Sequence, residues 1–247
     1  MMKILGIIPS RYASTRFPGK ALALINGKTM IQRVYEQADS CEAIHRLVVA
    51  TDHEAIFNHV KDFGGKPVLT GNTIRSGTER CFEAYKEIEK EENDFDVVIN
   101  IQGDEPFIQP DQIEKVAKLF TDKKVEIGTL IKKTSSESEL NDPNVVKVIK
   151  NLSDEAVYFS RAAIPYIRDK EKNDYNTIMF YKHVGVYGYR TNILKQLVQL
   201  PESSLEKAES LEQLRWLENG FKIHTVETDK DIIGIDTYDD LIKVTKT

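Results

Sequence analysis

The chain has 247 residues, 40% of them hydrophobic and 30% charged, which is the balance of a globular protein long enough to bury a large core. Its formal net charge of −5 at pH 7 argues against broad electrostatic binding to nucleic acid, which needs a basic face. Its two cysteines, Cys41 and Cys81, are too few for a disulfide framework and form no CxxC pair, so neither a zinc site nor a redox site is expected.

The N-terminal segment, MMKILGIIPSRY, contains an apolar run that is too short for the h-region of a signal peptide. No stretch of the chain approaches the roughly 20 apolar residues that a membrane helix needs. We therefore expect a cytoplasmic protein with no membrane insertion.

Short apolar runs alternate with amphipathic stretches in the first half, a pattern typical of βαβ units and a mainly parallel sheet. Asp52 is the expected N-cap of the second helix, and Gly64 and Gly65 are expected to end that helix. The run 96–102 is the most apolar and is therefore placed centrally, and Pro110 is expected to open the next helix. The other predicted strands are 4–8, 46–51 and 66–69, and the other predicted helices are 30–38 and 79–92.

The second half is less regular. Three runs, 125–131, 145–149 and 179–189, are predicted as strands, some of them antiparallel. A helix is predicted over 205–219, followed by strands at 221–228 and 231–236 and a last helix from about Tyr238. With no internal repeat and no linker, the chain is predicted to be one α/β domain, residues 1–247, whose mixed, mainly parallel sheet carries a β-rich subregion at about 125–189.

The loop after the first predicted strand holds three cations, Arg11, Arg16 and Lys20, together with hydroxyls and a glycine. This position is the usual ligand edge of an open α/β sheet. Cations and closely approaching backbone N–H groups would suit a polyphosphate, although the spacing matches neither a Walker loop nor a GxGxxG turn. A solvated loop with unrelated basic residues is the alternative.

A second loop, TGNTIRSGTER over 70–80, has a similar mixture of glycine, hydroxyls and cations. Taken alone, it is better explained as a helix entry in which Ser76 or Thr78 is the cap.

Two carboxylates are expected where strands end. Asp104 follows the central strand and Asp236 ends the predicted strand 231–236, so both would lie in the ligand crevice of the sheet. Thr237 and Asp240 already form an S/T-x-x-D capping pattern, so Asp236 is not needed as a cap. Hard cations such as Mg²⁺ prefer oxygen ligands together with substrate phosphates, so the two acids and the basic loop indicate a metal–triphosphate site.

Other polar residues give weaker signals. His183, Tyr187 and Arg161 are weaker candidates, since a histidine or tyrosine on a mixed strand more often fills a core or a sheet edge than binds a ligand. Glu212 lies one turn from Ala208 and Trp216 on the predicted helix, where a charge among apolar neighbours costs free energy unless it finds a partner. A functional role is therefore favoured for Glu212 over the other three.

Read together, these stretches resemble the 3-deoxy-D-manno-octulosonate (Kdo) cytidylyltransferases, or CMP-Kdo synthetases, over nearly the whole chain. The first motif alone would indicate only a sugar nucleotidyltransferase, and the stretches from NIQGDEP to LEQLRW indicate the Kdo enzyme. The stretches that carry the resemblance are IIPSRYASTRFPGK, SGTER, NIQGDEP, YFSRAAIP, HVGVYGYR, LEQLRW and GIDTYDDL.

The resemblance implies a nucleotide-diphospho-sugar transferase (Rossmann-like) fold, a homodimer, and Mg²⁺-dependent transfer of CMP from CTP to the anomeric hydroxyl of Kdo for lipopolysaccharide biosynthesis. It implies that Asp104 and Asp236 hold the metal and that Arg11 and Lys20 act with them in catalysis. The residues implied to bind CTP are Ser10, Arg11, Lys20, Ser76 and Arg80. Those implied to surround Kdo are Gln102, Arg161, His183, Tyr187, Glu212 and Gln213.

Two other functions remain open from the sequence. A cytidylyltransferase acting on an acylneuraminate would share the first motif. A non-catalytic nucleotide-binding module is possible because a fold does not determine a function, but the retained acids and basic residues argue against it.

Overall fold

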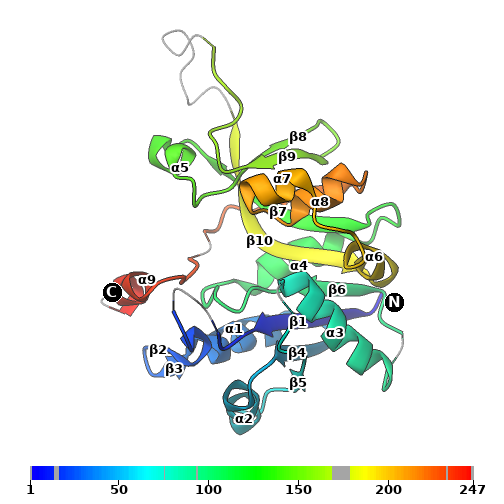
Figure 1. Ribbon diagram of the computed structural model, residues 1–247, viewed down its shortest axis with the longest axis vertical. Coiled ribbons are helices and arrows are strands. Elements are labelled where there is room, and N and C mark those ends of the chain that lie inside the picture. Colours follow the sequence, from blue (N-terminus) through cyan, green and yellow to red (C-terminus); the bar gives the residue numbers. More distant parts are fainter. Residues whose placement is uncertain are drawn as a thin grey trace.

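The computed structural model describes residues 2–13, 17–74, 76–92, 94–168, 179–231 and 233–245. Within that part of the chain, a nine-stranded sheet runs through the molecule in the order β11-β7-β10-β6-β1-β4-β5, with β8 beside β10 and β9 beside β8 (Figure 1). The predicted mixed α/β sheet flanked by helices is confirmed. The pairs on the β1 side of β6 are parallel, and most pairs on the other side are antiparallel.

The parallel side is formed by the predicted βαβ units. β1 pairs in parallel with β4 and with β6, and β4 pairs in parallel with β5. All of β6 is buried, and it lies at the centre of the sheet as predicted. The strands are β1 (Ile4–Ser10), β4 (Arg46–Thr51), β5 (Pro67–Leu69) and β6 (Val97–Asn100).

Helices cover both faces of the sheet. Successive residues of β1 point to opposite sides and are apolar on both, so each face has to be buried. Leu5 and Ile7 join the core with α3 (Gly77–Glu89), α6 (Thr191–Leu197) and α8 (Gln213–Glu218). Ile4 and Ile8 join the core on the other face, with α1 (Met30–Asp39), α2 (Glu54–Asp62) and α4 (Pro110–Leu119). Figure 1 shows α3 and α6 crossing in front of the sheet.

The antiparallel side contains the predicted β-rich subregion. β10 (Phe180–Arg190) is antiparallel to β6, to β7 (Ile127–Thr134) and to β8 (Lys147–Lys150), and β8 pairs with β9 (Ala156–Ser160). The pairing of β10 with β7 is interrupted by a bulge between Val184 and Tyr187. β11 (Ile223–Glu227) returns in parallel beside β7.

Helix boundaries mostly follow local signals. Ser76 caps α3 by accepting from the Glu79 N–H at 3.1 Å, and Pro110 opens α4. Gly64, with φ 86°, follows α2 where a left-handed residue is needed. The predicted capping pattern forms at the start of α9 (Tyr238–Thr245). The Thr237 N–H donates to the Asp240 carboxylate, and the Asp240 N–H donates to the Thr237 hydroxyl. The remaining short elements are η1 (Lys20–Leu22), β2 (Leu24–Ile25), β3 (Lys28–Thr29) and α5 (Glu137–Asn141).

Three local predictions were wrong. The helix expected over 205–219 is broken into α7 (Ser204–Glu209) and α8, because Ser210 adopts a left-handed conformation with φ 51°. The N-cap of α2 is His53, whose Nδ1 accepts from the Ala55 N–H, while Asp52 pairs with Arg80. The described residues of 231–236 form no strand. That segment is instead tied to the turn after β6 by a hydrogen bond from the Ile235 N–H to the Asp104 carbonyl, 2.9 Å long.

Candidate active site

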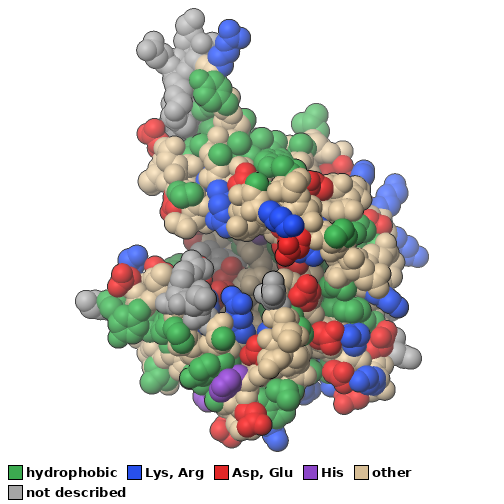
Figure 2. All heavy atoms as spheres, in the orientation of Figure 1, with side chains coloured by type: hydrophobic (Ala, Val, Ile, Leu, Met, Phe, Trp, Pro, Cys, Tyr) green, Lys and Arg blue, Asp and Glu red, His purple; other side chains and the backbone are tan. Residues whose placement is uncertain are grey.

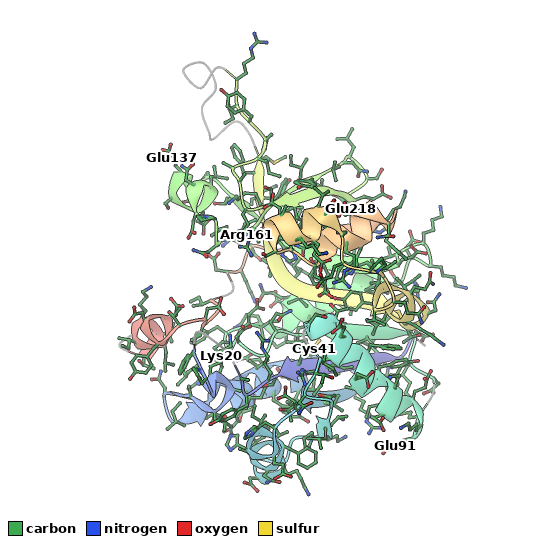
Figure 3. The ribbon with its side chains drawn as sticks, in the orientation of Figure 1. Lys20, Cys41, Glu91, Glu137, Arg161 and Glu218 are labelled. Atoms are coloured by element: carbon green, nitrogen blue, oxygen red, sulfur yellow. The ribbon has the colours of Figure 1, made fainter. Side chains whose placement is uncertain are left out.

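A charged cluster joins three of the predicted residues. The Lys20 ammonium lies 2.6 Å from Asp104 Oδ2 and 3.1 Å from Asp236 Oδ1, and it also contacts the Ile235 carbonyl. Lys20 opens η1, Asp104 follows β6 and Asp236 precedes α9, so three distant segments meet here. Figure 3 shows Lys20 at this edge of the sheet, below Arg161. The two acids therefore converge as the sequence predicted.

The backbone explains why these groups meet. Gly103 lets the turn after β6 lie directly on the end of β1, because a Cβ at this position would be 2.7 Å from the Pro9 carbonyl oxygen. Gly19, with φ 70°, turns the first loop back so that its N–H donates to the Tyr12 carbonyl before Lys20. Two glycines of the sequence motifs thus serve the geometry of the acids and of the lysine.

Glu105 is a half-buried acid, with a buried Oε2, that the sequence reasoning missed. Its Oε2 has no hydrogen-bond partner, and its Oε1 would lie 3.1 Å from a Cβ placed on Gly185 of β10. Burial, followed by the negative charges of Asp104 and Asp236, raises the pKa of Glu105 to about 8. The side chain is therefore mostly protonated at neutral pH in the absence of a cation. Its place in the GDEP turn alone did not indicate that it would lie against Gly185 of β10.

The donor set fits a magnesium ion that also takes oxygens from a substrate. Asp104 and Asp236 are both partly exposed and both within reach of one cationic group, Lys20. Among the described residues, no group of three or more His, Cys, Asp or Glu side chains forms a ready-made metal cage. Mg²⁺ usually binds one or two carboxylates, several waters and substrate phosphates, so the pair of acids is the expected arrangement.

A second cluster surrounds the bulge of β10. Gln102 Nε2 donates to the Gly185 carbonyl at 3.2 Å, and Gly185 lies between His183 and Tyr187 in the strand. The rings of His183 and Tyr187 are 5.1 Å apart. Burial lowers the pKa of His183 to about 3, so its imidazole is neutral at physiological pH. Three of the predicted sugar residues are thus brought together.

Glu212 completes this cluster from the link between α7 and α8. Its Oε2 accepts from the Thr78 hydroxyl at 2.7 Å, and burial raises the pKa of its carboxyl. The negative charge of Glu212, after burial itself, contributes to raising the pKa of Tyr187 and of Tyr189 well above their ordinary values. The rings of Tyr187 and Tyr189 both lie edge-on to Trp216.

Several buried polar atoms here have no hydrogen-bond partner among the residues that the structure describes. They are Asn100 Oδ1, Tyr187 OH, Tyr189 OH and Trp216 Nε1. Since an unpaired buried polar group costs free energy, such a concentration indicates a place where water or a polar ligand binds. Asn100, Tyr189 and Trp216 were missed because their residue types are typical of a strand or a core.

Among the described residues, the hydrogen bonds of the Arg161 guanidinium all go to backbone carbonyls. Its guanidinium donates to the carbonyls of Glu209 (2.7 Å) and Pro143 (2.9 Å) and makes a longer contact to Ser210 (3.4 Å). Glu209 returns the contact by accepting from the Arg161 N–H at 2.8 Å. Arg161 therefore fixes the break between α7 and α8, immediately before Glu212.

Arg80 is likewise fully engaged. It is buried, pairs with Asp52 at 2.9 Å and donates to the Thr70 hydroxyl, with longer contacts to the carbonyls of Gly71 and Ile74. Ser76 caps the same helix. These contacts shape the second loop, which agrees with its explanation as a helix entry.

The other predicted residues make fewer contacts. Ser10 is buried at the end of β1, and Gln213 is buried in the first turn of α8. Arg11 is exposed and makes no hydrogen bond or ion pair to another described residue. Arg16 lies outside the described residues. Figure 2 shows a recess across the middle of this face, bordered by both acidic and basic side chains.

No helix in the described ranges combines the length and the apolar character that a membrane crossing requires. A family model described as Cytidylyltransferase matches residues 5–227.

Curated relatives and solved structures agree with that match. The 3-deoxy-manno-octulosonate cytidylyltransferase of Parabacteroides distasonis is 54% identical, with 98% of this chain and 97% of the relative covered. The enzyme of the same description from Bacteroides thetaiotaomicron is 52% identical, with 97% and 96% covered. A CMP:2-keto-3-deoxy-manno-octonic acid synthetase solved with CTP is 41% identical, with a TM-score of 0.89 over 99% of this chain and 97% of that one. At 13% identity, a 4-diphosphocytidyl-2C-methyl-D-erythritol synthase from Anaerococcus prevotii shares only the fold, with a TM-score of 0.61 over 99% and 97% of the chains.

Proposed function

The chain belongs to the 3-deoxy-manno-octulosonate cytidylyltransferase family, and we propose that it transfers CMP from CTP to the anomeric hydroxyl of Kdo and releases pyrophosphate. The observation that carries the proposal is the contact between the two clusters. Gly185, between His183 and Tyr187, is hydrogen-bonded by Gln102 and lies against Glu105, the neighbour of Asp104. A sugar beside β10 would therefore lie next to a nucleotide phosphate at Asp104.

The charged cluster would handle the phosphates. A magnesium ion held by Asp104 and Asp236 would neutralise phosphate charge and lower the pKa of the attacking hydroxyl. Lys20, already between these carboxylates, would stabilise the negative charge that develops on the leaving pyrophosphate. Arg11, exposed and without an ion pair to any described residue, would supply a second cation.

The second cluster would bind and orient the sugar acid. Glu212 and the neutral His183 would accept hydrogen bonds from sugar hydroxyls, while Gln102 and Tyr187 offer donors. The unpaired atoms of Tyr187 and Tyr189 support a polar ligand in this place. Holding two reactants in place converts a bimolecular step into an effectively unimolecular one. We expect this positioning to be the main contribution of the second cluster to the reaction.

Two of the residues first assigned to substrates receive revised roles. Arg80 would act on CTP through the second loop, whose Thr70 and Gly71 it holds. Arg161 would act on the sugar mainly by fixing the segment that carries Glu212, and its remaining N–H donors would face the sugar carboxylate.

Pyrophosphate release from CTP and Mg²⁺ tests the proposed function, measured with Kdo, with N-acetylneuraminate and with no sugar. We expect release with Kdo only. Release only with N-acetylneuraminate would support CMP transfer from CTP but show that Kdo is not the acceptor. Binding of CTP without release in any mixture would favour the non-catalytic nucleotide-binding module.

We also propose that the protein forms a homodimer through its β-rich subregion. Leu152, Val157, Tyr166 and Met179 are large apolar side chains exposed in or beside that subregion. Burial of such side chains against a second copy of the chain would remove apolar surface from water and favour association. Light scattering should give a molar mass twice that of the chain. Substitution of both Val157 and Tyr166 by serine should reduce the measured mass to that of a single chain.

A further inference from the structure

The bulge of β10 is held by a buried hydroxyl on the next strand. Thr129 of β7 is fully buried, and its Oγ1 lies 2.8 Å from the Val186 carbonyl oxygen and 2.9 Å from His183 Nε2. The Val184 carbonyl oxygen is farther, at 3.5 Å. One hydroxyl thus contacts both the bulge and a predicted sugar residue.

The position of each proton follows from what these groups can do. A carbonyl oxygen can only accept a hydrogen bond, and a hydroxyl has one proton to donate. The short contact to Val186 therefore takes the Thr129 proton, so Oγ1 can only accept from the ring of His183. Nε2 then carries the imidazole proton, and Nδ1 keeps a lone pair.

The surroundings hold the ring in this state. Phe159 lies edge-on to His183 with centroids 5.2 Å apart, and Tyr187 lies on another side at 5.1 Å. Burial disfavours a second proton on the ring. Within the described part of the chain, Nδ1 makes no hydrogen bond.

We propose that Thr129 is a positioning residue that holds His183 as the neutral Nε2–H tautomer, so that Nδ1 accepts a hydrogen bond from a hydroxyl of the bound sugar acid. The sugar contact rests on the proposed function, whereas the tautomer does not. An acceptor at Nδ1 favours a hydroxyl and disfavours the sugar carboxylate, so this tautomer would select one orientation of the acid over the reverse.

The tautomer is measurable without any substrate. The protein has five histidines, so ¹⁵N-histidine labelling gives a simple two-bond ¹H–¹⁵N spectrum, and His183→Gln identifies the His183 signals. We expect wild type to show a protonated Nε2 and an unprotonated Nδ1. In Thr129→Val, the buried N–H would face a methyl group, so the proton should move to Nδ1.

Thr225→Val is the matched control. Thr225 is the β11 partner of Thr129 in the sheet and is also buried, but its hydroxyl contacts the Asp154 carbonyl and not His183. This variant should keep the wild-type tautomer. A proton on Nδ1 in wild type, or an unchanged tautomer in Thr129→Val, would overturn the proposal.

Kinetics separates the tautomer from the sugar contact. Thr129→Val should raise KM for Kdo about tenfold, the loss expected for one hydrogen bond, with KM for CTP unchanged. Thr129→Ser, which keeps the hydroxyl, should restore both the tautomer and KM. If Thr129→Val changes the tautomer but leaves KM for Kdo unchanged, the placement of His183 against the sugar is wrong, while control of its tautomer by Thr129 stands.

Discussion

The two sides of the candidate site differ in how they treat charge. On the parallel side, Lys20, Asp104 and Asp236 have side chains that are 17%, 29% and 47% exposed, and the lysine pairs with both carboxylates. On the antiparallel side, Thr129, Tyr189 and Trp216 are 0%, 0% and 1% exposed, and the titratable groups there are mostly held neutral. One side carries partly solvated charge, and the other carries polar groups that are mostly buried.

This difference agrees with what each reactant needs. A triphosphate brings several negative charges, which exposed cations and a metal can meet without a large desolvation cost. A sugar acid is distinguished by the directions of its hydroxyls, which rigid and partly unsatisfied polar groups recognise best. Substitutions on the parallel side should therefore change kcat, and those on the antiparallel side should change KM for the sugar.

The largest effect is expected for Asp104→Asn. Loss of this charge should lower kcat about 10³-fold, since it removes stabilisation that acts in the transition state, and should change the Kd for CTP much less. Steady-state pyrophosphate release and CTP titration measure the two quantities. The control is Asp111→Asn. It breaks the ion pair between Asp111 of α4 and Lys230, and it should leave kcat unchanged. Near-normal turnover of Asp104→Asn at saturating Mg²⁺ would contradict the metal assignment.

A smaller effect of a different kind is expected for Glu212→Ala. Removal of this buried acceptor should raise KM for Kdo about 30-fold, since a hydrogen bond to a charged group contributes about 2 kcal/mol. KM for CTP should stay within about twofold. Glu202→Ala, which removes an exposed acid paired with Lys207, should change neither value. A change confined to KM for CTP would move Glu212 to the nucleotide side.

The rigidity of the antiparallel side can be tested through Lys147. Its buried ammonium donates to the carbonyls of Asp142, Val145 and Arg161, at 2.8, 2.6 and 2.5 Å. Lys147→Met keeps the stem but removes the buried donor that all three carbonyls share, so the free energy of unfolding should fall by about 2 kcal/mol. Urea unfolding measures the change. Lys118→Met, in an exposed pair with Glu114, should be nearly neutral, and an equal loss there would contradict this explanation.

The last effect concerns the dependence of stability on pH. The pKa of His183 falls from 6.5 to about 3 on folding, so between these values the unfolded chain binds the proton and the folded protein does not. The free energy of unfolding should therefore decrease as the pH falls from about 6.5 towards 3. His183→Gln should make this decrease shallower in denaturation curves measured across that range. Parallel curves for variant and wild type would show that the ring is not held neutral.

The charged side of the candidate site could largely be predicted from the sequence. The end of β6 and the basic loop after β1 predicted the meeting of Asp104 and Lys20, because parallel strands bring their carboxyl ends to one edge. Asp236 joins them although its predicted strand does not form, since the Ile235 N–H donates to the Asp104 carbonyl. Thr129 and Glu105 were not predictable, since their roles depend on a bulge and on the close approach of Gly185, which no local pattern encodes. The break at Ser210 was missed because serine carries no preference for a left-handed residue.

The same limit applies to the arginines. Their sequence context suggested substrate contacts, but Arg80 holds carbonyls of the loop that precedes it, and Arg161 holds carbonyls from segments farther away in the chain. An arginine in a motif can act on a ligand directly or through the loop that it fixes, and only the fold separates the two.

The most direct test of the account is a ³¹P NMR spectrum of the reaction itself. The protein, CTP, Mg²⁺ and Kdo are mixed, and the phosphorus signals are followed with time. We predict equal amounts of pyrophosphate and of a new CMP phosphodiester, with neither formed in Asp104→Asn at the wild-type rate. Pyrophosphate accompanied by free CMP would show hydrolysis instead of transfer, and an unchanged CTP spectrum would contradict the proposed activity.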